Sequence, residues 1–128
     1  MKNQQNKNCS EQFREEFVTL CMQMEKIPKR GNMAKYNKLQ DKMYKLVHSH
    51  IEADKEAIGE ILVSLLDHEN DFVRHAAACY CMKFDIQLSY ALVVQKELEK
   101  SEDEWIRVSA GMYLHSYERG ILEWQRNR

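Results

Sequence analysis

Catalysis or metal binding would have to come from a few histidines, cysteines and carboxylates at helical spacing. His48 and Glu52 lie four residues apart, so they would share one face of a helix and could hold a metal ion. No third ligand stands at a compatible spacing, since His50 would point elsewhere. Cys79 follows His75 by four residues, yet nothing nearby marks an oxyanion hole. The four glycines are scattered, which excludes a Gly-rich phosphate loop. The sequence therefore predicts no metal site, no cofactor and no enzymatic activity.

The four cysteines are expected to be reduced thiols. Cys79 and Cys81 would point roughly 200° apart on a helix of 3.6 residues per turn, so they cannot grip one metal ion together. Free thiols acting as small apolar residues are typical of cytosolic proteins. The stretch from Met1 to Cys9 is polar and does not have the apolar core of a secretion signal. A cytoplasmic location is expected.

Four lysines form a regular surface pattern. Lys35, Lys38, Lys42 and Lys45 follow one another in steps of three, four and three, which places them on one stripe of a helix. The stretch 26–45 holds seven basic residues and one acidic residue, whereas the stretch 97–104 is mainly acidic. Such runs are either solvated helix faces or surfaces that steer an acidic protein or a phosphate backbone toward the molecule.

Two arginines and two aromatic residues occupy matching places in later helices. Arg74 and Arg107 lie one turn inside their helices, where each could clamp an adjacent turn through an acidic residue or contact a partner. Phe72 and Trp105 stand at the starts of these helices, either as lids on the core or as anchors for a partner. The candidate binding residues are therefore Lys35, Lys38, Lys42, Lys45, Arg74, Trp105 and Arg107.

Six helices are predicted to position these side chains. Apolar residues recur every three or four positions, and Asn, Asp, Pro and Gly interrupt the pattern. The predicted helices cover about residues 10–27, 32–52, 54–66, 71–85, 87–100 and 104–120. Ser10, Asn32, Asp54 and Asp71 are expected as N-caps, and Gly120 as the stop of the last helix.

Composition supports a single all-α domain over residues 1–128, with a polar N-terminal tail over about residues 1–9. The chain has 128 residues, 44% of them hydrophobic, so it can bury a core of its own. Four glycines and one proline are too few for a fold with many tight turns. Charges nearly balance, at 19 basic and 20 acidic residues, and no apolar run is long enough to span a bilayer. A membrane partner is not expected.

The second half of the chain contains an internal repeat. The segment Asp71–Ala77 matches Glu104–Ala110 in residue type at six of seven positions, at an offset of 33 residues. The same offset places Leu65 on Leu98 and Tyr80 on Tyr113. Self-similarity at a fixed period is typical of arrays in which helix pairs bury their faces by stacking. Three stacked antiparallel pairs are therefore expected.

The residues around this repeat favour one class of array. The T-P-L-H turn of ankyrin repeats and the Trp, Gly and Pro pattern of tetratricopeptide repeats are absent. The segment 65–77 resembles the inter-helix turn and second helix of a HEAT repeat, and the stretch 58–120 is similar to a family of small bacterial HEAT-like domains. The resemblance implies a short right-handed α-α superhelix and, for some members, an immunity- or antitoxin-type binding function.

The sequence therefore predicts a protein-binding module whose partner it does not identify. An array fold, an uneven charge distribution and the lack of a catalytic constellation all favour this function. An immunity-type inhibitor that sequesters a partner toxin is the more specific expectation from the resemblance. The alternative is nucleic-acid binding through the lysine stripe of the second helix.

Overall fold

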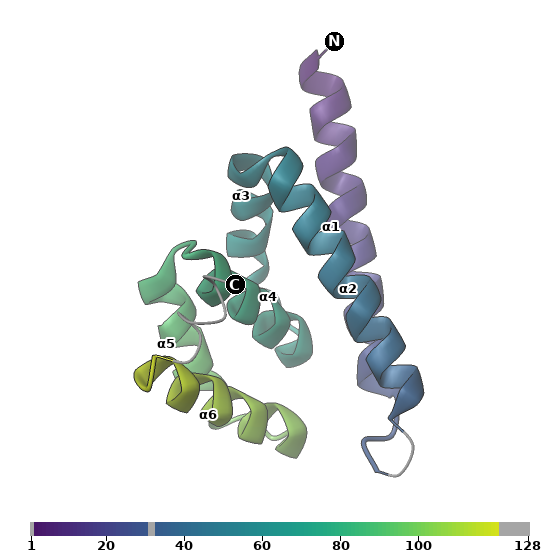
Figure 1. The fold of residues 1–128 in the computed structure, drawn as a ribbon. Helices are drawn as coiled ribbons and strands as arrows, with labels where there is room; N and C mark the ends of the chain where they lie inside the picture. Colours follow the sequence, from purple (N-terminus) through teal and green to yellow (C-terminus); the bar gives the residue numbers. More distant parts are fainter. Residues whose placement is uncertain (1, 31–32, 121–128) are drawn as a thin grey trace. The chain divides into compact units, whose positions relative to one another are not determined.

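The computed structural model describes residues 2–30 and 33–120, with side chains from Cys9 onward. These residues form six α-helices and no strand (Figure 1). The helices are α1 (Lys2–Lys26), α2 (Ala34–Ala53), α3 (Lys55–Leu65), α4 (Asp71–Phe84), α5 (Leu88–Leu98) and α6 (Glu104–Glu118). The predicted all-α fold of about six helices is confirmed.

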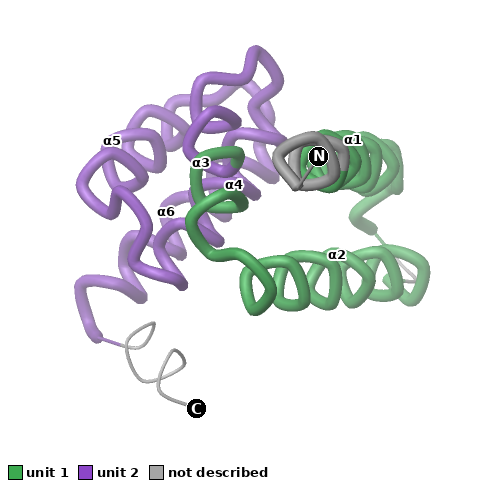
Figure 2. Tube along the Cα trace, turned by 90° about the horizontal axis from the view of Figure 1, so that it is seen from above, with its two compact units in different colours: residues 1–61 green, residues 62–128 purple. Residues whose placement is uncertain are grey.

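The chain divides into two compact units, residues 1–61 and residues 62–128 (Figure 2). The first unit holds α1, α2 and the beginning of α3, and the second holds the end of α3 with α4, α5 and α6. The HEAT-like stacking of three pairs and the single domain over residues 1–128 stay predictions.

In the first unit, α1 packs against α2. Helix α1 buries Phe13, Phe17, Cys21 and Met24, and α2 buries Tyr36, Met43, Val47 and Ile51. Successive buried residues in each set are three, four or seven positions apart, which places them on one helix face. Burial of these apolar faces, at roughly 25 cal/mol per Å², is what holds the two helices together.

Helix α1 extends farther toward the N-terminus than the sequence pattern indicates. It begins at Lys2 rather than at Ser10, so the segment predicted as a polar tail is helical over residues 2–9. The stretch 2–8 has no apolar residue and therefore carries no periodic signal, but it also lacks glycine and proline, which would break a helix. The helix ends at Lys26, just before Pro28, as predicted.

Lys29 closes the C-terminal end of α1. Its Nζ donates to the carbonyl oxygens of Met24 at 2.7 Å, Glu25 at 3.1 Å and Ile27 at 2.7 Å. The same ammonium lies 5.4 Å from the ring centroid of Tyr36 on α2. A cation at this place satisfies carbonyls that have no partner inside the helix and faces the negative end of the helix dipole. Lys29 therefore stabilises the C-terminal end of α1.

In the second unit, α4 packs against α5 and α6, and α5 packs against α6. Val73 on α4 and Ile106 on α6, which the repeat places in equivalent positions, are both fully buried. The small residues Ala77 and Ala110 follow each of them by one turn and are also fully buried. Small side chains at these places let helices approach closely.

The N-cap of α4 is not the residue that the sequence indicates, and the N-cap of α6 is the residue before its predicted start. Asn70, not Asp71, accepts a hydrogen bond from the Val73 N–H at 3.0 Å. Asp103, one residue before Glu104, accepts from the Ile106 N–H at 3.2 Å. Asn70 and Asp71 cannot be ranked by residue type, because both are favoured N-caps, and the extended backbone of Asn70 decides between them.

The other predicted ends have mixed outcomes. Asp54 caps α3 as predicted, since its Oδ1 accepts from the Ala57 N–H at 3.1 Å. Asn32 lies outside the described residues, and Met33 precedes α2 without a side-chain hydrogen bond. Gly120 follows α6 with a φ of 78°, the left-handed conformation expected of a helix stop.

Candidate binding surface

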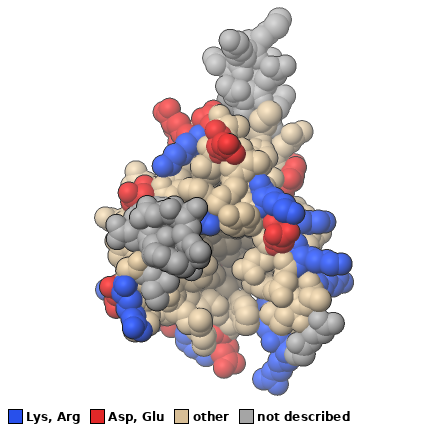
Figure 3. Space-filling model, in the orientation of Figure 1, with Lys and Arg blue, Asp and Glu red and all other residues tan. Residues whose placement is uncertain are grey.

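The four lysines of the predicted stripe are all exposed on α2. The buried residues of the same helix are Tyr36, Met43, Val47 and Ile51, which lie on a different face, so the charge points away from the core. We call the exposed side chains of Lys35, Lys38, Lys42 and Lys45 the lysine face. Figure 3 shows Lys and Arg side chains gathered along the side of the first unit that carries α2.

One acidic residue moderates the charge of the lysine face. The Lys45 Nζ lies 3.1 Å from the Asp41 Oδ2, one helical turn away. Both side chains are largely exposed, at 75% and 63%, so the pair contributes between about 0 and 1 kcal/mol and leaves Lys45 available to a partner. The lysine face is thus a basic strip with a local acidic interruption.

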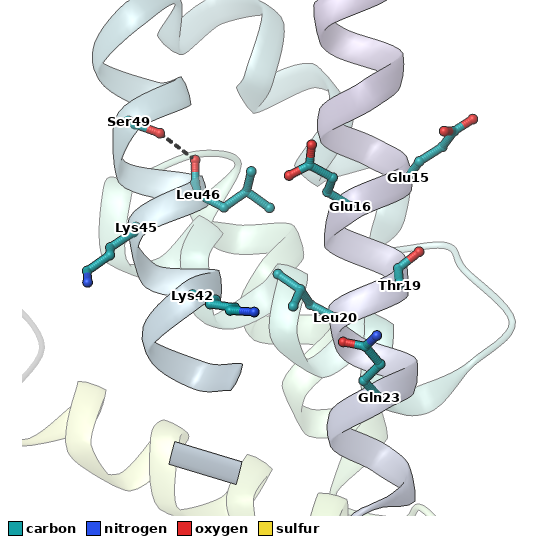
Figure 4. Close-up of a pocket in the computed structure, with 9 residues that line it drawn as sticks. All are labelled: Glu15, Glu16, Thr19, Leu20, Gln23, Lys42, Lys45, Leu46 and Ser49. Carbon is teal, nitrogen blue, oxygen red and sulfur yellow. Dashed lines mark hydrogen bonds between the residues drawn. The ribbon is translucent and has the colours of Figure 1, made fainter. Parts of the chain in front are cut away.

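A groove of about 650 Å³ runs between α1 and α2 beside the lysine face (Figure 4). Its lining comes from both helices of the first unit and consists of Glu15, Glu16, Thr19, Leu20, Gln23, Lys42, Lys45, Leu46 and Ser49. Two members of the lysine face, Lys42 and Lys45, therefore also form one wall of the groove. No sequence pattern indicates this groove, because it arises only when the two helices pack.

Acidic and basic side chains lie on opposite walls of the groove. Leu20 and Leu46 point into the space between the helices and form an apolar strip (Figure 4). The α1 wall carries Glu16 directed toward α2, and Glu15 at its outer edge, while Lys42 reaches from α2 toward α1. The groove thus has an acidic wall, an apolar middle and a basic wall.

The candidate residues Arg74, Arg107 and Trp105 belong to the second unit. Arg74 donates to the Leu66 carbonyl at 3.1 Å and to the Glu97 Oε2 on α5 at 2.6 Å, so it joins α4 to its neighbour. Arg107 donates to the Ser101 carbonyl at 2.9 Å, in the turn before α6. Arg74 therefore takes the clamping role that was one of the two predicted alternatives. Trp105 is half-buried.

A buried polar cluster in the second unit joins the predicted neighbours His75 and Cys79 to Gln95. The His75 Nδ1–H donates to the Gln95 Oε1 at 2.9 Å, and the Gln95 Nε2 donates to the Cys79 Sγ at 3.4 Å. The Cys79 Sγ lies 3.6 Å from the His75 Nε2, which completes a ring of contacts. His75 also meets the Tyr113 ring edge-on, with centroids 5.6 Å apart. Gln95, fully buried among apolar neighbours of α5, was missed in the sequence.

The electrostatics of this cluster oppose nucleophilic catalysis. Burial raises the pKa of the Cys79 thiol to about 12, against weaker lowering by its hydrogen bonds to Gln95 and Tyr113. Burial also lowers the pKa of His75 below 6.5, outweighing the opposite effect of the Gln95 hydrogen bond. A thiol is a nucleophile as the thiolate, which this environment disfavours at neutral pH. The cluster is better suited to fixing the packing of α4, α5 and α6.

The histidines considered as metal ligands have other contacts. His48 stacks on Tyr44, with ring centroids 3.8 Å apart. His50 donates from Nδ1 to the Leu46 carbonyl at 2.8 Å and lies 5.1 Å from the Phe13 ring centroid. Across residues 2–30 and 33–120, no three His, Cys, Asp or Glu side chains are grouped as metal ligands.

Comparisons with protein-family models, with curated proteins and with solved structures each found no match. None of the helices within the described ranges combines the length and apolar character needed to cross a membrane.

Proposed function

We propose that this protein is a non-enzymatic binding module that binds an acidic surface of a partner protein through the lysine face. The observation that carries the proposal is the exposure of all four lysines on one side of α2, within a stretch of seven basic residues and one acidic residue. Their spacing extends the charge over about 15 Å of helix, from Lys35 to Lys45. A strip of this length steers an acidic surface toward the molecule and fixes its register.

One further observation supports a binding rather than a catalytic role. The one cysteine–histidine pair that the sequence suggested is closed to nucleophilic chemistry by the raised pKa of Cys79. The four cysteines are free thiols, which fits action in the reducing cytoplasm.

The more specific form of the proposal is an inhibitor of the immunity type, which occupies the site of a partner enzyme. Inhibitors of this kind gain speed and selectivity from complementary charge. The resemblance to small bacterial HEAT-like domains suggests this role, and the basic strip on α2 supplies a surface for it.

Nucleic-acid binding is the second candidate, since exposed lysines along a helix can also follow a phosphate backbone. Two features weigh against it. Asp41 is paired with Lys45 within the strip, and Glu15 and Glu16 line the wall opposite Lys42. A continuous phosphate backbone would be repelled by these carboxylates, whereas a protein surface of mixed charge can accommodate them.

Affinity capture with charge-reversed bait tests the proposal. The bait variant replaces the lysine face by Lys35→Glu, Lys38→Glu, Lys42→Glu and Lys45→Glu. The matched control changes four other exposed basic residues, through Lys55→Glu, Lys96→Glu, Lys100→Glu and Arg119→Glu. Baits are incubated with lysate of the source cells, with and without nuclease, and bound proteins are identified by mass spectrometry.

The proposal expects an acidic protein that the wild type and the control bait both enrich, that the lysine-face variant loses, and that nuclease does not release. Equal enrichment on all three baits would refute the role of the lysine face. Release of the captured material by nuclease would instead establish the nucleic-acid alternative.

A further inference from the structure

The groove beside the lysine face has the form of a helix-binding site. Leu20 on α1 and Leu46 on α2 face each other across its middle and are only half-buried. Lys42 and Lys45 line one wall, and Glu15 and Glu16 the other. We propose that this groove docks an amphipathic helix of the partner, with its acidic edge against α2 and its basic edge against α1. This inference rests on the proposed function.

A helix fits the groove better than an extended chain does. An extended segment exposes a backbone N–H and a C=O at every residue and needs matching groups along its length. The groove offers only the side chains of Thr19, Gln23 and Ser49 as neutral polar groups, and the Ser49 hydroxyl already donates to the Leu46 carbonyl at 3.1 Å. A helix satisfies its own backbone and presents apolar residues at positions i, i+3 and i+4 to a narrow apolar strip.

The extent of the groove limits the length of the docked segment. Its α1 wall runs from Glu15 to Gln23 and its α2 wall from Lys42 to Ser49, each of which spans about 10 to 12 Å at 1.5 Å per residue. About two turns of a partner helix cover this distance, so two or three apolar anchors are enough to fill the strip between Leu20 and Leu46.

Charge separation gives the site its specificity. A helix with acidic residues along both edges would meet Glu15 and Glu16 on one side, and a helix with basic residues along both edges would meet Lys42 and Lys45 on the other. Only a helix with its two signs on opposite edges satisfies both walls. Two of these charges, Glu16 and Lys42, point into the groove (Figure 4). Two exposed charge pairs that each change affinity by a factor of about 1.5 to 2 together give a preference of roughly two- to fourfold.

Two synthetic helical peptides test the inference on the full chain. Both carry leucines at i, i+3 and i+7 over about four turns and are held helical by a hydrocarbon staple. In the segregated peptide, glutamates occupy one edge and lysines the other; in the mixed peptide, of the same composition, the two residue types alternate on both edges. Binding is followed by fluorescence anisotropy at low ionic strength, where exposed charge pairs are least screened.

The protein variants localise the effect. Lys42→Glu with Lys45→Glu makes both walls acidic, whereas Lys35→Glu with Lys38→Glu changes the net charge equally on the part of the lysine face outside the groove. Circular dichroism verifies that both variants stay helical. We expect the wild type and the Lys35/Lys38 variant to bind the segregated peptide about two- to fourfold more tightly than the mixed one. The Lys42/Lys45 variant should lose this preference.

Equal affinity of the wild type for the two peptides would overturn the inference, as would equal effects of the two double variants. Sedimentation of the free chain tests another occupant, a second copy. A dimer that the Lys42/Lys45 variant dissociates would assign the groove to self-association and overturn the inference too. The proposed function fails separately, through the capture experiment, if the bait with all four lysines reversed still enriches the partner.

Discussion

Replacement of Gln95 by methionine should expose how much the buried cluster contributes to the second unit. Gln95 is fully buried and accepts the His75 Nδ1–H at 2.9 Å. Methionine has nearly the same length and volume, so the variant keeps the packing and removes the acceptor. A buried donor left without a partner costs about 1 to 3 kcal/mol. At a typical urea dependence of about 2 kcal/mol per M, the unfolding midpoint should fall by about 0.5 to 1.5 M.

A double-mutant cycle separates this hydrogen bond from the packing around it. His75→Phe, Gln95→Met and the double variant are unfolded in urea while Trp105 fluorescence is recorded in a Trp124→Phe background, which leaves one tryptophan in the chain. Removal of both polar partners leaves no orphaned donor, so the double variant should be more stable than the sum of the single effects predicts, by about 1 kcal/mol or more. Additivity to within about 0.5 kcal/mol would refute the network. Lys96→Met, on the exposed side of α5, serves as the neutral control.

Three further predictions concern His75, Arg74 and Cys79. Because burial lowers the pKa of His75 in the folded state below 6.5, the unfolded chain binds the proton more readily, so stability should be full above about pH 6.5 and fall at lower pH. His75→Phe should flatten this profile of urea midpoint between about pH 5 and 7, and an equally steep profile in the variant would contradict the role of His75. Arg74→Met, which removes the bonds to the Leu66 carbonyl and to Glu97, should lower the free energy of unfolding by about 1 to 2 kcal/mol, and an unchanged urea midpoint would contradict the clamp. Iodoacetamide at pH 8 should modify the exposed Cys9 much faster than Cys79, whose pKa is raised to about 12; peptide mass mapping follows both, and comparable rates would show that the thiol is not held as described.

Helix positions could be predicted from the sequence because apolar residues repeat at the helical period. Val73 and Ile106 illustrate this, since both fall on the predicted inward faces and both are fully buried. Helix ends were less predictable. Asn70 and Asp71 are both good caps, and only the backbone conformation of Asn70 selects it. The start of α1 at Lys2 could not be predicted, because residues 2–8 are all polar and no apolar residue repeats at the helical period there.

The exposed lysines of α2 were predictable for the same reason, as they lie opposite the periodic apolar face. The groove was not, because it depends on which residues of α1 come to lie beside Lys42 and Lys45. The partner of His75 was equally hidden: Gln95 follows it by 20 residues and reaches it only through the packing of α5 on α4. Pairwise packing is a tertiary property that a single periodic pattern does not encode.

Hydrogen exchange with the captured partner tests the binding surface most directly. The partner that the wild-type bait enriches is purified and added in excess, and amide exchange is compared with that of the free chain. Docking beside the lysine face should slow exchange along the groove, at residues 15–23 of α1 and 42–49 of α2. Slowed exchange restricted to α4, α5 and α6, with α1 and α2 unchanged, would contradict the account.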